Sequence, residues 1–376
     1  MAQSKNPQLT ALNEVGQSVW YDNLSKDVLK SGELAGLIGA GVSGLTSNPT
    51  IFKNAIADTS NYDDDIRSLV KQNLNTEEIC EELMIKDVGA AADLLRPIYD
   101  ASRGADGCAS IEVSPYLARD TAGTIAAARR LWQRLNRPNV MIKIPATDEG
   151  LPAIRTALEE GLNVNITLIF SVAYHEKVME AYLSALEARV AKQLPIDRIA
   201  SVASFFVSRV DAICEKRFDE LLKSGKVKEE NRAEFLAKVG IANSRLAYAR
   251  FKEIFGHERF RKLQAKNARV QRPLWASTGT KNPAFSPVLY VEELAGPDTV
   301  NTMPPATLKA LMQKATIENR LERGVEAARQ LCSRVKAMGI DLEQCLMELQ
   351  SQGGKSFSDS YRELLESIEK KKTALA

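Results

Sequence analysis

The sequence predicts an α/β fold, a (β/α)₈ barrel of the TIM type with additional helices. About eight short apolar segments are each followed by a stretch with helical periodicity, which is the alternation of such a barrel. A polar side chain recurs near the C-terminal end of one strand after another. No Gly-x-Gly-x-x-Gly follows the first strand, which weakens a dinucleotide-binding interpretation. A doubly wound open sheet gives the same alternation and stays open as an alternative.

The chain length of 376 residues allows one large α/β domain or two smaller ones. We expect a single barrel domain over residues 1–376, in which residues 307–376 form a C-terminal helical extension. The 50 basic and 48 acidic residues nearly cancel, so the chain lacks the basic footprint of a nucleic-acid-binding protein. An anionic partner must therefore be met by a local cluster of charge.

The sequence also bears on location and metals. The N-terminus lacks the apolar core of a signal peptide, and no apolar run reaches transmembrane length. The five cysteines show no metal-site spacing and are expected to be reduced thiols, so we expect a cytoplasmic protein. His175 and His257 are the only histidines, and both lie in charged helical stretches. This argues against a zinc site or a histidine-based triad, and we expect no metal.

The first third of the chain alternates helix and strand. A short helix over Leu9–Gly16 precedes a strand over Ser18–Asp22 that ends on a carboxylate, and a helix follows over Ser25–Gly32. A second strand over Gly41–Pro49 ends in a polar turn, because Asn-Pro breaks a strand. Residues 50–105 carry apolar side chains at helical spacing and are predicted to be mostly helical.

The middle of the chain contains three further strands. Ser110–Ser114 alternates apolar and polar side chains, which places Glu112 on the polar face. A helix over Asp120–Leu135 leads to a segment, Val140–Phe170, that holds two strands around a helix over Glu149–Glu160.

Lys143 stands out in this segment, because it interrupts a β-branched run. Alternation places Lys143 and Met141 on one face of their strand, and a row of polar residues shares one face of the next: Asn163, Asn165 and Thr167, opposite Val164, Ile166 and Leu168. Lys143 and the polar row can then point into a shared interior. Desolvation disfavours an ammonium and favours the neutral amine that a Schiff-base nucleophile needs. The alternative is a lysine on a solvent-facing strand edge that guards against aggregation.

The last predicted elements complete the barrel. A helix over Ala173–Lys192 precedes a strand over Arg198–Ser208, and a long helical region fills 210–268. Pro273–Thr278 is the seventh strand, and Thr299–Met303 is a weak eighth strand closed by two prolines. The chain from Thr307 is predicted to be helical, with a solvated face at Glu369–Lys372.

The polar groups at the strand ends predict one site, because the C-terminal ends of barrel strands converge. They are Asp22, Thr46, Asn48, Glu112, Lys143, Asn165, Thr167, Ser204, Arg209, Ser277 and Lys281. An amine, carboxylates, amides and two cations suit imine chemistry on a phosphorylated carbonyl compound. Each residue alone has a structural explanation: Asp22 and Asn48 as turn or cap residues, Glu112 as a partner of an arginine, and the cations as surface charges.

Two motifs resemble signatures of the transaldolase family. Leu45-Thr-Ser-Asn-Pro-Thr-Ile-Phe52 resembles the first, although Leu45 departs from the residues usual there. Val140-Met-Ile-Lys-Ile-Pro-Ala-Thr-Asp-Glu-Gly150 resembles the second, which is centred on the Schiff-base lysine. Ala242–Tyr248 and Thr299–Pro305 resemble the longer bacterial branch, and the similarity runs from about residue 10 to about 365.

The resemblance implies a (β/α)₈ barrel that transfers a dihydroxyacetone unit in the non-oxidative pentose phosphate pathway. The donor would be fructose 6-phosphate or sedoheptulose 7-phosphate, and the acceptor glyceraldehyde 3-phosphate or erythrose 4-phosphate. No cofactor would be needed, and the partners would be small sugar phosphates. The chain would be a monomer or a homodimer.

The resemblance also implies a role for each matching residue. Lys143 would form the imine, Asp22 would take the proton as the carbon–carbon bond breaks, and Glu112 would act through a water with Thr167. The implied substrate-binding residues are Thr46, Asn48, Asn165, Ser204, Phe206 and Arg209, the last of them for phosphate. The second phosphate-binding arginine of the family has no match here, so Lys281 and Ser277 are assigned to phosphate in its place.

Three alternatives belong to other functional classes. An aldolase on the same scaffold would release free dihydroxyacetone, although the small aldolases of the family are much shorter than this chain. A non-catalytic sugar-phosphate-binding or scaffold protein would keep its role after Lys143→Ala. A pyridoxal-phosphate barrel would absorb light near 400 nm.

Overall fold

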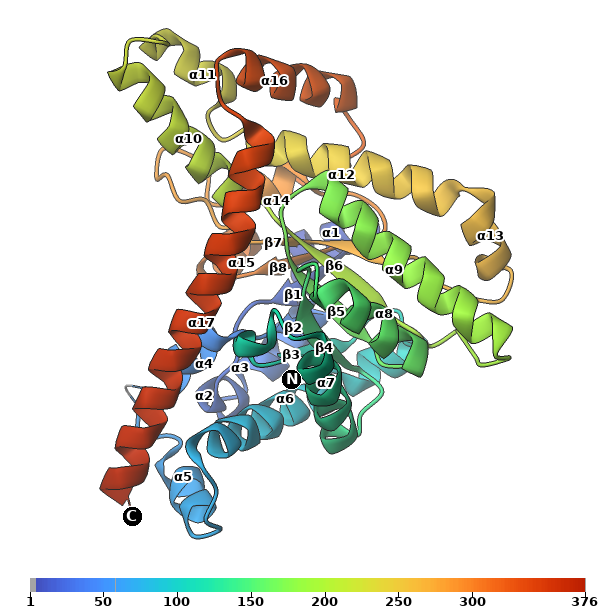
Figure 1. Cartoon of the computed structure of the whole chain (residues 1–376), viewed down its shortest axis with the longest axis vertical. Helices are drawn as coiled ribbons and strands as arrows, with labels where there is room; N and C mark the ends of the chain where they lie inside the picture. Colours follow the sequence, from blue (N-terminus) through green and yellow to red (C-terminus); the bar gives the residue numbers. More distant parts are fainter. Residues whose placement is uncertain (1–4, 58, 376) are drawn as a thin grey trace.

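A computed structural model describes residues 5–57 and 59–375, which form a closed barrel of eight parallel strands (Figure 1). Each strand pairs with the next along the chain, and β8 pairs with β1. The (β/α)₈ prediction is therefore confirmed, and the doubly wound open sheet is excluded. The strands are β1 Gln17–Tyr21, β2 Gly44–Thr46, β3 Cys108–Glu112, β4 Val140–Pro145, β5 Val164–Ile169, β6 Ser201–Phe206, β7 Arg272–Ala276 and β8 Thr299–Met303.

The helices surround the barrel and extend beyond it. They are α1 Pro7–Glu14, α2 Lys26–Lys30, α3 Glu33–Ala40, α4 Pro49–Ile56, α5 Asp63–Val70, α6 Thr76–Ala101, α7 Thr121–Leu135, α8 Gly150–Glu160, α9 Val172–Ala191, α10 Ser208–Lys223, α11 Arg232–Phe235, α12 Val239–Gly256, α13 Glu258–Gln264, α14 Leu289–Glu293, α15 Pro305–Gln313, α16 Val325–Ala337 and α17 Leu342–Leu375, with short 3₁₀ helices η1 Pro115–Leu117 and η2 Glu229–Asn231. None of the helices in the described part of the chain has the length and apolar character needed to cross a membrane.

Several predicted boundaries are wrong. Strand β2 has three residues rather than Gly41–Pro49, because Asn48 caps α4 by accepting a hydrogen bond from Ile51 N at 3.0 Å. The expected helix from Thr307 onward is interrupted, since residues 314–324 are not helical. The expected solvated face at Glu369–Lys372 is also wrong in part. Lys371 Nζ pairs with Asp63 at 2.8 Å, and Glu369 accepts a hydrogen bond from Thr76.

The β5 strand departs from regular alternation near its C-terminal end. Its register with β6 shifts between Ile166 and Ile169, and Leu168 has a φ of 60°, a conformation that a branched side chain rarely adopts. Leu168 therefore leaves the aliphatic face it was predicted to share with Ile166. Asn163 precedes β5 and does not join the interior row, because its amide group donates to Pro138 O and accepts from Ala200 N.

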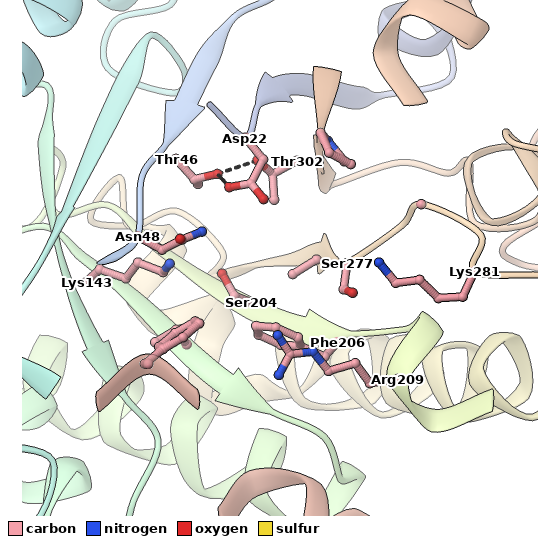
Figure 2. A pocket seen from close by; sticks show the side chains of 15 residues that line it. Asp22, Thr46, Asn48, Lys143, Ser204, Phe206, Arg209, Ser277, Lys281 and Thr302 are labelled. Carbon is pink, nitrogen blue, oxygen red and sulfur yellow. Dashed lines mark hydrogen bonds between the residues drawn. The ribbon is translucent and has the colours of Figure 1, made fainter. Parts of the chain in front are cut away.

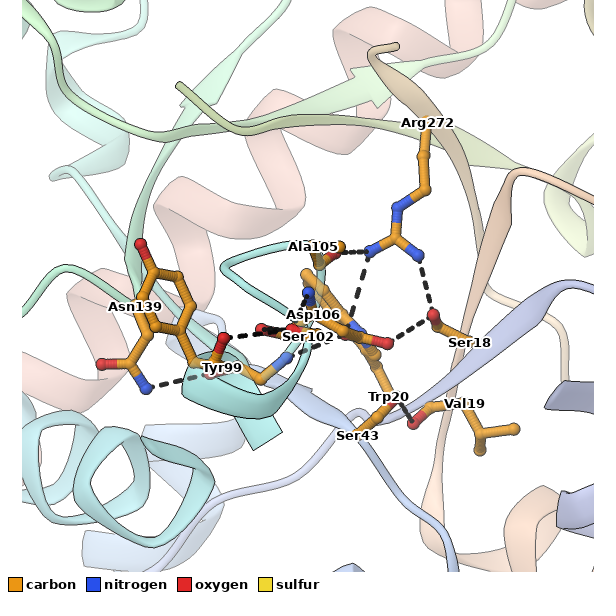
Figure 3. Close-up of polar contacts among 11 residues, drawn as sticks. Ser18, Val19, Trp20, Ser43, Tyr99, Ser102, Ala105, Asp106, Asn139 and Arg272 are labelled. Atoms are coloured by element: carbon orange, nitrogen blue, oxygen red, sulfur yellow. Dashed lines mark hydrogen bonds and ion pairs between the residues drawn. The ribbon is translucent and has the colours of Figure 1, made fainter. Parts of the chain in front are cut away.

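Polar contacts close the N-terminal end of the barrel (Figure 3). Trp20 Nε1 donates to Asp106 at 2.8 Å, and Arg272 donates to Ser18 Oγ at 2.7 Å and to Ala105 O at 2.9 Å. The Trp20 ring lies against the backbone of Gly44, where an added Cβ would come within 2.4 Å of the ring. These contacts tie β1 and β7 to the loop between α6 and β3.

Helix α17 is the long element that crosses the barrel from α10 and α16 toward α5 (red in Figure 1). It has 34 residues and contacts α4, α5, α6, α10 and β5. Its buried residues recur on one face, so the apolar stripe of the helix is turned toward the barrel: Cys345, Leu346, Leu349, Gly353, Phe357, Tyr361, Leu364 and Ile368.

Candidate active site

A cavity of about 180 Å³ lies at the C-terminal end of the barrel (Figure 2). Ten of the twelve residues that the sequence analysis assigned to the site line this cavity: Asp22, Thr46, Asn48, Lys143, Thr167, Ser204, Phe206, Arg209, Ser277 and Lys281. The other two, Glu112 and Asn165, lie behind the wall, where they contact Lys143 and Ser204. The volume suits a small polar ligand, since sites for drug-sized molecules are larger.

Lys143 points into the barrel from β4 and is only 5% exposed. Its strand neighbours in the register are Glu112 on β3 and Asn165 on β5. Lys143 Nζ donates to Ser47 O at 3.1 Å and lies 3.2 Å from Glu112 Oε2. A closed barrel has no free edge, so the interpretation of Lys143 as an edge guard is wrong.

Glu112 is the buried partner of this lysine. Burial raises the pKa of the Glu112 carboxyl, the Lys143 ammonium opposes that shift, and Asp22 adds to it. Glu112 Oε2 is buried with Lys143 Nζ as its charged neighbour, whereas Thr167 Oγ1 is buried without a hydrogen bond among the described residues. Buried polar atoms normally have partners, so the Thr167 hydroxyl is available to a reacting molecule.

Asp22 sits across the cavity and is held by two threonines. Thr46 Oγ1 donates to Asp22 Oδ1 at 2.6 Å and is itself 2.6 Å from Thr302 Oγ1. Burial raises the pKa of the Asp22 carboxyl, while Lys143 and the Thr46 hydrogen bond lower it in part. Both carboxyl groups of the site are therefore easier to protonate than a carboxyl group in water.

Amide and hydroxyl groups fill the space between these charges. Asn165 Nδ2 donates to Ser110 Oγ at 3.0 Å, and Ser204 Oγ donates to Asn165 Oδ1 at 2.7 Å, which fixes the orientation of the Asn165 amide. Asn48 uses its oxygen to cap α4, and its amide nitrogen makes no hydrogen bond among the described residues. Asn48 thus combines a structural role with a donor at the cavity wall.

The outer part of the cavity carries positive charge. The Arg209 guanidinium lies 5.3 Å from the centre of the Phe206 ring, and neither it nor Lys281 forms an ion pair with any described residue. Burial lowers the pKa of Arg209, which shows that its charge is partly desolvated. Ser277, with a φ of 57°, lies 2.9 Å from Ser208 through their hydroxyl oxygens. An anion would meet both cations here.

The sequence analysis missed several lining residues. Thr302 ends β8 and touches Thr46, and Phe357 comes from α17, with its ring centre 5.5 Å from Lys143 Nζ. The rule that found the other polar strand ends applies equally to Thr302. No local pattern indicates Phe357, because its place depends on how α17 crosses the barrel. The remaining missed residues are Ala276, Gly279 and Pro304.

Comparison with known proteins decides the family. The profile described as "Transaldolase/Fructose-6-phosphate aldolase" matches residues 19–368. The chain belongs to the transaldolase family. It is 45% identical over 370 residues to the transaldolase of Trichodesmium erythraeum, covering 96% of this chain and 97% of that protein. It is 46% identical to transaldolase 2 of Nostoc sp., over 96% and 97% of the two chains.

A third relative widens the range of organisms. The transaldolase of Mycobacterium marinum is 44% identical over 379 residues, which is 99% of both chains. Transaldolase similarity thus extends over nearly the whole length, including α17, and the resemblance drawn from two motifs is confirmed.

Proposed function

We propose that this transaldolase-family chain transfers a dihydroxyacetone unit from fructose 6-phosphate or sedoheptulose 7-phosphate to an aldose phosphate. The acceptor is glyceraldehyde 3-phosphate or erythrose 4-phosphate, as in the non-oxidative pentose phosphate pathway. The observation that carries the proposal is Lys143, a buried amine in a polar cavity between two carboxyl groups. Family membership supports the same activity.

The reaction begins at Lys143. Its neutral amine attacks the ketone carbon, and loss of water from the resulting carbinolamine forms the imine. Glu112, 3.2 Å from the amine and with a raised pKa, is suited to exchange protons during this step. Thr167 Oγ1, which is buried without a hydrogen bond to any described residue, is proposed to hold, together with Glu112, the water that carries those protons.

Bond cleavage follows from the electronics of the protonated imine. The bond between the carbons α and β to the imine breaks, and its electron pair moves toward the nitrogen, which leaves a neutral enamine. Asp22 takes the proton from the β-hydroxyl as the aldehyde departs. Thr46 holds Asp22 in place through the 2.6 Å hydrogen bond, and Thr302 holds Thr46.

Transfer reverses these steps on a second aldehyde. The enamine attacks the acceptor carbonyl, Asp22 returns the proton to the new hydroxyl, and hydrolysis of the imine frees Lys143. Asn48 is proposed to bind hydroxyls of the three-carbon unit, with Ser204 and Phe206 beside it. Asn165, which the family resemblance assigns to the same role, lies behind the wall and accepts the hydrogen bond of Ser204.

The phosphate would bind at the rim of the cavity. Arg209 offers a partly desolvated guanidinium, which suits a phosphate dianion. Lys281 and Ser277 are proposed as its companions, with a lysine in the place of the family's second arginine.

The domain organisation and the cellular location form a second part of the proposal. We propose one barrel domain over the whole chain, with α15–α17 packed against it. The described cysteines are free thiols, which supports a cytoplasmic location.

Borohydride trapping tests the proposed chemistry. The protein is treated with fructose 6-phosphate and sodium borohydride, with and without glyceraldehyde 3-phosphate, and peptides are analysed by mass spectrometry. We expect a reduced three-carbon adduct on Lys143 that disappears when acceptor is present. An adduct that persists with acceptor indicates the aldolase alternative, and no adduct in folded protein overturns the mechanism.

A further inference from the structure

Helix α17 is held on the barrel at points on both sides of Phe357. Gln350 Nε2 donates to Ala146 O at 2.7 Å, in the loop that follows the Lys143 strand. The Tyr361 ring meets Tyr116 edge-on, with ring centres 5.2 Å apart. Phe357 and Tyr361 follow Gln350 by seven and eleven positions, so all three side chains lie on one side of the helix.

The helix also approaches the barrel closely at Gly353. An added Cβ there would lie 2.8 Å from Leu168 Cδ2 and 3.7 Å from Arg209 Nη1. Leu168 reaches this point because of its unusual backbone at the β5 irregularity. Two separate features, a glycine on the helix and a strained leucine on the strand, thus fit α17 against the cavity wall.

Phe357 brings an aromatic ring to the reactive amine. It is only 6% exposed, and its ring centre is 5.5 Å from Lys143 Nζ. It belongs to an apolar cluster with Leu168, Phe170 and Phe206. Most other side chains around the amine are polar, so this ring supplies apolar cover.

We propose that Phe357 shields the Lys143 enamine from water and so sets the balance between transfer and hydrolysis. The inference rests on the proposed function. In the unwanted branch, the enamine carbon takes a proton, water adds to the imine carbon, and the carbon–nitrogen bond breaks to release dihydroxyacetone and the free amine. In the transfer branch, the enamine carbon attacks an aldehyde instead of taking that proton. An apolar ring over the amine slows the hydrolytic branch without contributing to bond cleavage.

The test compares two products that come from one enamine. Fructose 6-phosphate and erythrose 4-phosphate are supplied together, and free dihydroxyacetone and sedoheptulose 7-phosphate are both quantified. For Phe357→Ala, we expect the ratio of dihydroxyacetone to transfer product to rise about tenfold, and for Phe357→Leu about threefold, since leucine restores part of the cover. A general loss of activity leaves this ratio unchanged.

Leu364→Ala is the matched control. Leu364 is fully buried on the same helix, within the other apolar cluster and outside the cavity lining, so its truncation loosens α17 without uncovering Lys143. We expect its product ratio to equal that of the wild type. If Phe357→Ala does not fold, Phe357→Leu decides alone.

The outcomes separate the two proposals. A wild-type protein that forms no borohydride adduct and no transfer product contradicts the proposed function itself. A wild type that transfers, with Phe357 variants at the wild-type ratio, overturns the shielding role and leaves the function standing. An equal rise in Leu364→Ala also overturns it, because helix mobility would then explain the change.

Discussion

Two adjacent glycines in α17 give a controlled test of how the helix is seated. Gly353 is buried, and an added Cβ would lie 2.8 Å from Leu168 Cδ2, whereas nothing lies within 4 Å of a Cβ built at Gly354. Both occupy the interior of the same helix. Alanine at either position gains the same helix propensity, so the difference between the variants isolates the contact with Leu168.

The expected magnitudes follow from two terms. Glycine to alanine in a helix interior stabilises by about 1 kcal/mol. Inserting a methyl group into a packed site costs about 1–3 kcal/mol. Gly354→Ala should therefore stabilise the protein by about 1 kcal/mol. Gly353→Ala should be neutral or destabilising by up to about 2 kcal/mol, a separation of about 1–3 kcal/mol between the variants.

The assay is urea unfolding of both variants beside the wild type, followed by circular dichroism. The two variants should differ in the urea concentration at the midpoint of unfolding, while the dependence of unfolding free energy on urea concentration stays the same. Thermal melting offers a check, although a chain of this length shifts by only about 1 °C per kcal/mol. Equal stability changes at the two positions would show that α17 does not press on Leu168, and the close seating inferred here would be wrong.

Three further predictions concern the reactive amine, the two cations and a buried carboxyl group. Lys143→Met should remove the borohydride adduct and lower kcat by about 10⁴-fold or more, measured with coupled detection of the released aldehyde phosphate. Arg209→Ala should lower kcat/KM for a phosphorylated donor by about 10–100-fold, and Lys281→Ala, which is exposed, by only a few-fold; equal losses would contradict the assignment. Burial raises the pKa of Asp211 from 3.8 to about 6, so its stabilising contribution is complete below pH 3.8 and is lost as pH rises through 6. Between pH 4 and pH 7 the wild type should lose about 2 kcal/mol of unfolding free energy that Asp211→Asn does not lose. Asp148→Asn, at a carboxyl group whose pKa is lowered by Tyr174 and Lys177, should change the slope of unfolding free energy with pH in the opposite direction.

Local alternation in the sequence predicted the inner face of the barrel where β3, β4 and the first part of β5 are regular. Lys143 faces Glu112 and Asn165 across neighbouring strands, as the period of two implied. Regular strands at these positions keep side chains on one face whatever the rest of the chain does. Thr302 obeys the same rule, so alternation along the weak strand β8 indicates this residue as well.

Other features depend on contacts between distant parts of the chain. The backbone of Leu168 departs from alternation where β5 meets β6 and α17, and no local residue preference indicates that. The short β2 strand follows from Asn48 capping α4, which competes with its place in a strand. Phe357 lies more than two hundred residues from Lys143 in the sequence, so only the path of α17 brings the two together.

The distribution of charge also gives the substrate a direction. The inner cavity holds one amine and two carboxyl groups whose pKa values burial raises, so it offers proton exchange with little net charge. Arg209 and Lys281 stand at the other end with no carboxylate partner among the described side chains. A dianionic phosphate is favoured at that end, because Arg209 and Lys281 have no described carboxylate partner there, whereas Lys143 is already paired with Glu112. The proposed orientation then leaves the carbonyl end of a sugar phosphate facing Lys143, whose Nζ lies 5.5 Å from the centre of the Phe357 ring.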